Sequence, residues 1–195
     1  MEQAEMHLKK SSESTVLVTD ERVAHPKFWV AALVQIHSEK SVSKKLQALG
    51  VENFVPTQQE THQWSDRRKK VERVVIPMIV FIHTYKDEIK KLAYHSFILK
   101  LLTYPGQKEP AIIPDEQIET LRFMLNQSDA QVEIRDMVFK TGDRVRIVRG
   151  ALKNIEGELC KVESGKSMVS VQIDCLGYAC VSVDVGELEV LNKVN

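Results

Sequence analysis

A dense basic segment is the sharpest candidate for chemistry in this sequence of 195 residues. Its cations are Arg67, Arg68, Lys69 and Lys70. Trp64 precedes them, and Asp66 and Glu72 flank the run. Adjacent cations neutralise phosphates and an indole ring stacks on a base, so the segment predicts contact with nucleic acid. The alternative is a solvent-exposed turn with Trp64 packed against its own domain.

A second, smaller basic group follows the spacing of a helix. Lys40, Lys44 and Gln47 stand at i, i+4 and i+7, so they share one face, and His37 precedes them. Val42, Leu46 and Leu49 form the opposite, apolar face. The basic face is either a nucleic-acid contact or a solvated helix surface, and its charge pattern alone leaves both open.

No grouping of residues predicts catalysis. The six histidines are scattered, and no Walker loop, nucleophile elbow or zinc-protease motif is present. Cys160, Cys175 and Cys180 contain no C-x-x-C pair, and no histidine follows His95 to complete a zinc site. We therefore expect no enzyme activity, no cofactor and no metal, and we interpret the cysteines as buried, reduced thiols.

Charge is distributed unevenly along the chain. Residues 26–127 hold 15 Lys/Arg and 11 Asp/Glu, whereas residues 128–195 hold 9 and 11. The central block is therefore the part expected to face phosphate. Residues 1–25 are polar and acidic without an apolar core, so we predict a disordered extension rather than a signal peptide. No apolar stretch is long enough to span a bilayer, and we expect a cytoplasmic protein without membrane contact.

The elements that must position these residues alternate between strands and helices up to residue 127. Residues 57–75 are polar and predict a projecting hairpin or loop. The most apolar run, residues 74–82, predicts a central strand with Pro77 at its entry. The other predicted strands are 28–34, 53–55 and 97–102, and the predicted helices are 38–49, 87–93 and 114–125. The pattern indicates an α/β sandwich over residues 26–127.

The C-terminal part differs in kind. Residues 128–139 lose the periodic pattern and are predicted to be a linker. Residues 140–195 show strict alternation of apolar and polar side chains, as in 144–147, 169–174 and 181–185, with glycines at turn spacing. Several short strands in so few residues predict a small β-barrel.

One motif in this barrel resembles a known module. Residues 141–159 resemble a KOW motif, with Gly-Asp, an alternating strand, Gly150, a short loop and Gly157. Gly150 permits a tight turn, and Gly157 leaves room where two backbones pass closely. The loop 151–154 departs from the usual Pro-Phe-x-Gly.

The N-terminal block resembles the NusG N-terminal domain. The resemblance rests on Phe28-Trp29, Ser38-Glu39-Lys40, the apolar strand 76–81 and the segment Pro110 to Pro114. Residues 63–71 are similar to the UpxY-like branch, whose members act on polysaccharide operons. Met78-Ile79 replaces the aromatic residue usual after that proline. The resemblance covers residues 27–191.

The resemblance implies an α+β fold, in which a NusG N-terminal domain is followed by an SH3-like KOW barrel. It also implies that the chain binds the clamp helices of RNA polymerase. The implied polymerase-binding residues are Phe28, Trp29, Pro77, Ile79 and Phe81. It further implies contact of the two basic groups with non-template DNA or leader RNA. A ribosomal protein or termination factor is a candidate partner of the barrel, and we expect a monomer. The implied function is transcription elongation or antitermination of a polysaccharide biosynthesis operon; the alternative is an RNA-binding or ribosome-associated KOW protein.

The polymerase face can be defined further from the central strand. Ile79 and Phe81 share one face of a strand, and Val80 and Ile82 share the other. Because the following helices can cover only one face, we predict that Ile79 and Phe81 lie on an open apolar surface available to a partner.

Overall fold

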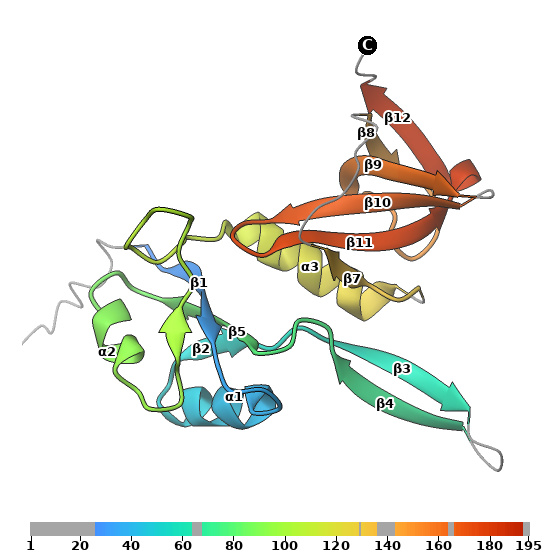
Figure 1. Ribbon diagram of the computed structural model, residues 1–195. Coiled ribbons are helices and arrows are strands. Elements are labelled where there is room, and N and C mark those ends of the chain that lie inside the picture. The colour runs from blue at the N-terminus through green and yellow to red at the C-terminus, as the bar shows by residue number, and fades with distance from the viewer. Residues whose placement is uncertain (1–25, 64–67, 129, 136–142, 164–165, 193–195) are drawn as a thin grey trace, which may run out of the picture.

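The computed structural model describes residues 26–63, 68–128, 130–135, 143–163 and 166–192 (Figure 1). The predicted N-terminal extension, residues 1–25, lies outside the described residues. The chain forms an N-terminal α/β unit, a long hairpin that projects from it, and a C-terminal β unit, with helix α3 at the junction between them (Figure 1).

A four-stranded antiparallel sheet, ordered β2-β5-β1-β6, is the centre of the N-terminal unit. Its strands are β1 (Phe28–Leu33), β2 (Glu52–Phe54), β5 (Ile79–Thr84) and β6 (Lys100–Leu101). Residues of β1 and β5 pair throughout, with Ala31 opposite Phe81. Strand β6 is shorter than the predicted 97–102, because Phe97 and Ile98 precede it in a turn.

Helices cover both faces of this sheet. α1 (Glu39–Ala48) and α2 (Ile89–Ala93) pack Val42, Leu46 and Leu92 against the face that carries Val80 and Ile82. On the other face, α3 (Asp115–Gln127) buries Ile118, Leu121, Met124 and Leu125. The three predicted helices are confirmed.

Helix α1 begins and ends where the sequence predicts, but its start uses a different contact. Ser38 occupies the N-cap position, yet its hydroxyl donates to the Gln35 carbonyl rather than accepting from the helix. Gly50 ends the helix with φ +72°, in the left-handed region that glycine adopts without strain.

The predicted strand 74–82 is divided by a turn. Val74 ends β4 and Ile79 begins β5, with Pro77 and Met78 between them. Met78 has φ +65°, and its N–H donates to the buried carboxylate of Glu39 at 2.7 Å. Proline supplies no donor for a ladder, and positive φ does not fit a strand, so the apolar run cannot remain one element.

Residues 57–75 form the projecting hairpin that the sequence predicts. Strands β3 (Thr57–Gln63) and β4 (Arg68–Val74) pair along their full length. The hairpin extends away from the sheet, as Figure 1 shows.

The C-terminal unit is a six-stranded antiparallel sheet, ordered β12-β8-β9-β10-β11-β7. Alternate residues such as Val145, Ile147, Val169 and Val181 form its core, as the alternation predicts. Gly157 lies where β9 and β10 pass closely, since a Cβ there would meet the Ser170 carbonyl oxygen at 2.5 Å. The barrel strands are β8 (Arg144–Ile147), β9 (Glu156–Glu163), β10 (Lys166–Ile173), β11 (Gly177–Asp184) and β12 (Leu188–Asn192).

The segment predicted as a linker, residues 128–139, contains ordered structure in its described part. β7 (Glu133–Arg135) pairs with Tyr178 to Cys180 of β11 and so joins the barrel sheet. Val132 is fully buried. The composition of this segment is polar, but its apolar Val132 and Ile134 pack in the core cluster.

Candidate functional site

The face predicted to be open is covered. Trp29, Ile79 and Phe81 are exposed by 4%, 5% and 0%, respectively, within a core cluster that α3 closes. The assumption that helices cover only one face of the sheet was wrong, because α3 follows the last strand and crosses to the opposite side. Of the other two predicted polymerase contacts, Phe28 is half-buried and Pro77 is exposed.

Helix α3 can contact two neighbours because it has two adjacent stripes, a buried apolar one and one that contains the half-buried Gln117. Ile118, Leu121 and Leu125, at helical spacing, lie over the sheet. Gln117 and Met124 are seven residues apart and form a second stripe beside the first. The Gln117 amide oxygen accepts the backbone N–H of Asp174, at the end of β10, at 2.7 Å. α3 is therefore packed between the sheet and the barrel (Figure 1).

The barrel is joined to the N-terminal unit by a second contact at the same place. The Tyr104 hydroxyl donates to the Asp174 carboxylate at 3.0 Å. Burial, and then this hydrogen bond, raise the pKa of the Tyr104 hydroxyl. Asp174 thus accepts a hydrogen bond from Tyr104 through its side chain and donates one to Gln117 through its backbone, so it contacts the N-terminal unit twice.

A buried glutamine at the base of the hairpin holds the segment between the two units. Gln58 is only 3% exposed. Its amide nitrogen donates to the carbonyls of Ser128 (3.2 Å) and Ala130 (2.9 Å), and its amide oxygen accepts the Val132 N–H (2.9 Å). These bonds fix the path of the chain as it leaves α3, and they explain why a polar residue lies in the interior.

An aromatic cluster of Trp29, Phe54, Phe81 and His83 occupies the α3 side of the sheet. Trp29 stacks on His83 with ring centroids 4.6 Å apart, and Phe54 stacks on Phe81 at 5.8 Å. The Arg122 guanidinium of α3 lies 4.9 Å from the Trp29 ring and 4.8 Å from the Phe54 ring. Phe54, His83 and Arg122 are half-buried, so this part of the cluster still reaches the surface.

Carboxylates surround the histidine of this cluster. His83 Nδ1 lies 2.8 Å from Glu52, and Nε2 lies 3.8 Å from Asp115 at the start of α3. The hydrogen bond to His83 is the main reason why the pKa of Glu52 lies below its usual value; the charges of His83, Arg122 and Lys27 add to it. The site therefore carries both signs of charge around aromatic surface.

The basic residues predicted on α1 lie at the surface. His37, Lys40, Lys44 and Gln47 are all exposed. The Lys40 ammonium, however, lies 2.5 Å from the Glu72 carboxylate of β4, and this contact lowers the pKa of Glu72. Lys40 therefore ties α1 to the hairpin as well as adding charge to that face.

The basic run on the hairpin is only partly described. Lys70 is exposed on β4. Arg68 and Lys69 pair through their backbones with Gln63 and His62. Trp64 and Arg67 lie outside the described residues.

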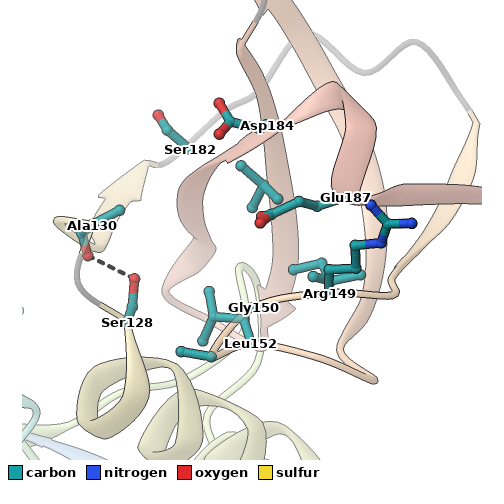
Figure 2. A pocket seen from close by; sticks show the side chains of 11 residues that line it. Ser128, Ala130, Arg149, Gly150, Leu152, Ser182, Asp184 and Glu187 are labelled. Carbon is teal, nitrogen blue, oxygen red and sulfur yellow. Dashed lines mark hydrogen bonds between the residues drawn. The ribbon is translucent and has the colours of Figure 1, made fainter.

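A cavity of about 380 Å³ lies where the end of α3 meets the barrel, and Figure 2 shows its lining. Ser128 Oγ donates to the Ala130 carbonyl on one side, and Leu152 lines another part of the wall. Arg149, Asp184 and Glu187 place both signs of charge around it. This mixed lining favours neither an anionic nor a cationic ligand.

The three cysteines have the properties of inert thiols. Cys160 and Cys180 are buried, and burial raises the pKa of both Cys175 and Cys180 to about 11. A thiol with so high a pKa stays protonated and unreactive at neutral pH. Among the described residues no group of His, Cys, Asp and Glu could hold a metal ion, and no helix has the length and apolar character needed to cross a membrane.

Sequence reasoning missed Phe54, Gln58 and Arg122. Phe54 was assigned to a short strand without a role, and Gln58 was one polar residue in a polar hairpin. Arg122 had a usable signal, since it lies four residues after Ile118 and therefore borders the apolar stripe of α3.

Comparisons with known proteins relate the N-terminal unit to a protein family. Residues 27–122 match the family described as "Transcription termination factor nusG". A "Transcription termination/antitermination protein NusG" of Staphylococcus carnosus (strain TM300) is 24% identical over 165 residues, covering 78% of this chain and 87% of that protein.

Two further similarities are more limited. The protein of the same description from Staphylococcus aureus (strain Mu50 / ATCC 700699) is 30% identical over 87 residues, so the match spans 46% of that protein's length. A solved structure titled "Domain interaction in Thermotoga maritima NusG" is 18% identical with a TM-score of 0.49, covering 85% of this chain and 98% of that one.

Proposed function

We propose that this NusG-like chain, whose residues 27–122 match the NusG family, binds RNA polymerase through its N-terminal domain and promotes processive transcription past terminators. The family match carries this proposal, since it coincides with the unit that holds the aromatic cluster. The resemblance of residues 63–71 supports a polysaccharide biosynthesis operon as the target.

The polymerase contact is proposed at the part of the aromatic cluster that reaches the surface. Phe54 and Arg122 offer half-exposed apolar and cationic surface, whereas Trp29, Ile79 and Phe81 support it from below. Pro77 is exposed at the turn before β5 and is a further candidate. Aromatic and arginine side chains of this kind are the usual anchors of protein interfaces.

Retention on immobilised core polymerase tests the contact. Phe54→Ala and Arg122→Ala should each reduce retention, with little change in melting temperature because both side chains are half-exposed. Phe123→Ala, which removes a 40% exposed ring from the residue that follows Arg122 in α3, is the matched control and should bind normally. Unchanged retention of both test variants would remove this surface from the proposal.

The activity itself is measured with purified elongation complexes on a template that carries a terminator. Adding the protein should increase the fraction of transcripts that pass the terminator. If the protein instead copurifies with ribosomal subunits and leaves termination unchanged, the function is that of a ribosome-associated KOW protein.

A further inference from the structure

A carboxylate lies in the interior of the N-terminal unit, at the start of α1. Glu39, the first residue of that helix, is 3% exposed. Burial of a carboxylate is unfavourable unless the group is hydrogen-bonded, so its position needs an explanation. Its Oε1 accepts the backbone N–H of Met78 at 2.7 Å. Glu39 therefore links the start of α1 to the turn between β4 and β5.

The same turn is held from another side by the chain that follows β1. The Met78 carbonyl accepts the N–H of Val34 at 2.8 Å. Met78 thus has both backbone polar groups paired while its φ is +65°, a conformation that is unfavourable for a residue with a side chain. Such a conformation persists only where the surrounding contacts hold it. Glu39 supplies one of the two contacts, and its removal would leave the Met78 N–H without its partner.

This turn sets the direction in which the hairpin leaves the sheet. β2 and β5 are neighbours in the sheet, and along the chain β3 follows β2 and β4 precedes β5. Residues 74–82 are apolar enough to form one continuous strand, as the sequence predicts, so the interruption at residues 77–78 depends on contacts rather than on composition. Figure 1 shows the hairpin projecting from the sheet beyond this turn.

A second residue of α1 reaches the hairpin itself. The Lys40 ammonium lies 2.5 Å from the Glu72 carboxylate of β4, and the Thr57 hydroxyl of β3 donates to the same carboxylate at 2.8 Å. Both charged side chains are about half-exposed, so solvent weakens this ion pair. Two consecutive residues of α1 thus hold the turn and the base of the hairpin, and the buried contact of Glu39 is the stronger of the two.

Three candidate contact residues are placed relative to one another by this turn. Phe54 ends β2 just before the hairpin, Pro77 is exposed in the turn, and Lys70 is exposed on β4. A change in the angle between the sheet and the hairpin would move these side chains apart. A partner that touches the sheet and the hairpin together binds more tightly when this angle is fixed in advance.

We propose that Glu39 is a positioning residue of the polymerase contact, because its carboxylate holds the turn that sets the angle between the hairpin and the sheet. The orientation of the hairpin is a property of the chain alone, whereas its effect on polymerase binding rests on the function proposed above. Glu39 is buried and does not itself contact the partner. Its removal should therefore act through the hairpin and not through the chemistry of the contact surface.

The orientation is measured without polymerase, by pulsed EPR on the full-length chain. Nitroxide labels are attached at two exposed positions, Lys70→Cys on β4 and Ala93→Cys on α2, in a Cys175→Ser background that leaves only buried native thiols. A narrow distance distribution is expected for this parent and for Glu39→Gln, which keeps an oxygen that can accept the Met78 N–H. Glu39→Ala should broaden or shift the distribution. Unchanged distances in Glu39→Ala would overturn the proposal.

Retention of the unlabelled variants on immobilised core polymerase tests the effect on the contact. Glu39→Ala should weaken binding on the order of tenfold, because a surface that is not preorganised must be ordered on binding, and Glu39→Gln should stay within about twofold of wild type. The matched control is Val42→Ala, which removes buried apolar atoms from the same helix without touching the turn. It should bind like wild type at a temperature at which circular dichroism shows all variants to be folded.

The two measurements separate this inference from the proposed function. A broadened distance distribution with normal retention would show that Glu39 is not a positioning residue of the contact. Equal losses of retention in Glu39→Ala and Val42→Ala would assign the effect to general destabilisation, with the same conclusion. If wild type itself is not retained, the proposed function fails, and the distance distributions still decide whether Glu39 orients the hairpin.

Discussion

The two faces of the N-terminal sheet are covered in different ways. On the Val80 and Ile82 face, α1 and α2 close an apolar core. On the Phe81 face, the strands present aromatic rings and a histidine between carboxylates, whereas α3 adds an arginine and contacts the barrel along its outer stripe. The first cover buries apolar side chains and makes its polar contacts, from Glu39 to Met78 and from Lys40 to Glu72, within the N-terminal unit and its hairpin. The second cover also joins two units and leaves part of the aromatic surface exposed. This difference explains why the second face is the better candidate for a partner.

The largest expected effect comes from truncating one fully buried side chain on each face of the sheet. Both Phe81 and Ile82 are fully buried. Phe81→Ala should lower the free energy of unfolding by about 3–5 kcal/mol and Ile82→Ala by about 2–5 kcal/mol, since each leaves a cavity. Thermal and urea denaturation measure both. If Phe81→Ala melted like wild type, the Phe81 face would be open in solution and the comparison above would be wrong.

A destabilising substitution inside the barrel tests whether the barrel stabilises the Phe81 face. In Gly157→Ala the new Cβ would meet Ser170 O at 2.5 Å and Val169 Cγ1 at 2.8 Å, so β9 and β10 must separate at a cost of about 3 kcal/mol. With Trp64→Phe as background, the fluorescence of Trp29 reports on the N-terminal unit. We expect its emission to shift to the red at lower urea concentrations than in the parent.

The matched control is Gly186→Ala, whose Cβ would meet nothing within 4 Å. It should leave the Trp29 transition unchanged. A Gly157→Ala barrel that unfolds without any effect on Trp29 would show that the two units are energetically independent.

A smaller loss of stability is expected from the hydrogen bonds that Gln58 makes to the segment after α3. Gln58→Leu removes all three hydrogen bonds to residues 128–132 and leaves the buried Val132 N–H without its partner. We expect a loss of about 1–3 kcal/mol, together with faster amide exchange at Val132. Gln59→Leu, at the exposed neighbouring position, should change neither quantity. Equal exchange in the two variants would mean that Gln58 does not hold this segment.

The sequence predicts most of the elements because local signals are strong here. The spacing of Ile118, Leu121 and Leu125 identifies α3, and the alternation of Val145 and Ile147 identifies a barrel strand. Gly50 and Gly157 behave as predicted because a positive φ and a close backbone approach are local requirements. The resemblance to NusG also follows from motifs in the sequence, and the family match over residues 27–122 supports it.

The arrangement of those elements was harder to predict. Nothing in residues 79–82 shows which helix will cover which face, so the burial of Ile79 and Phe81 depends on the path of α3. Gln58 becomes a structural residue only because Ser128 and Ala130 return to it from about seventy positions away. The turn at Pro77 and Met78 was hidden within an apolar run, because its stabilising partner, Glu39, lies on α1.

The smallest expected effect lies at the edge of the second face and depends on pH. The hydrogen bond to His83 lowers the pKa of Glu52 in the folded protein. Glu52 therefore stabilises the fold above the ordinary glutamate pKa of about 4.3, and this stabilisation is lost as the pH falls through the lower pKa of the folded state. Its side chain is half-exposed, so solvent screens the interaction and the effect should be small. Melting temperatures of wild type and Glu52→Gln should therefore differ at pH 6 and converge between about pH 4 and pH 3. Glu119→Gln, a change at an exposed position of α3, should run parallel to wild type. If Glu52→Gln also ran parallel over this range, Glu52 would not stabilise the edge of the Phe81 face, and the difference between the two faces would rest on the cluster and the barrel contact alone.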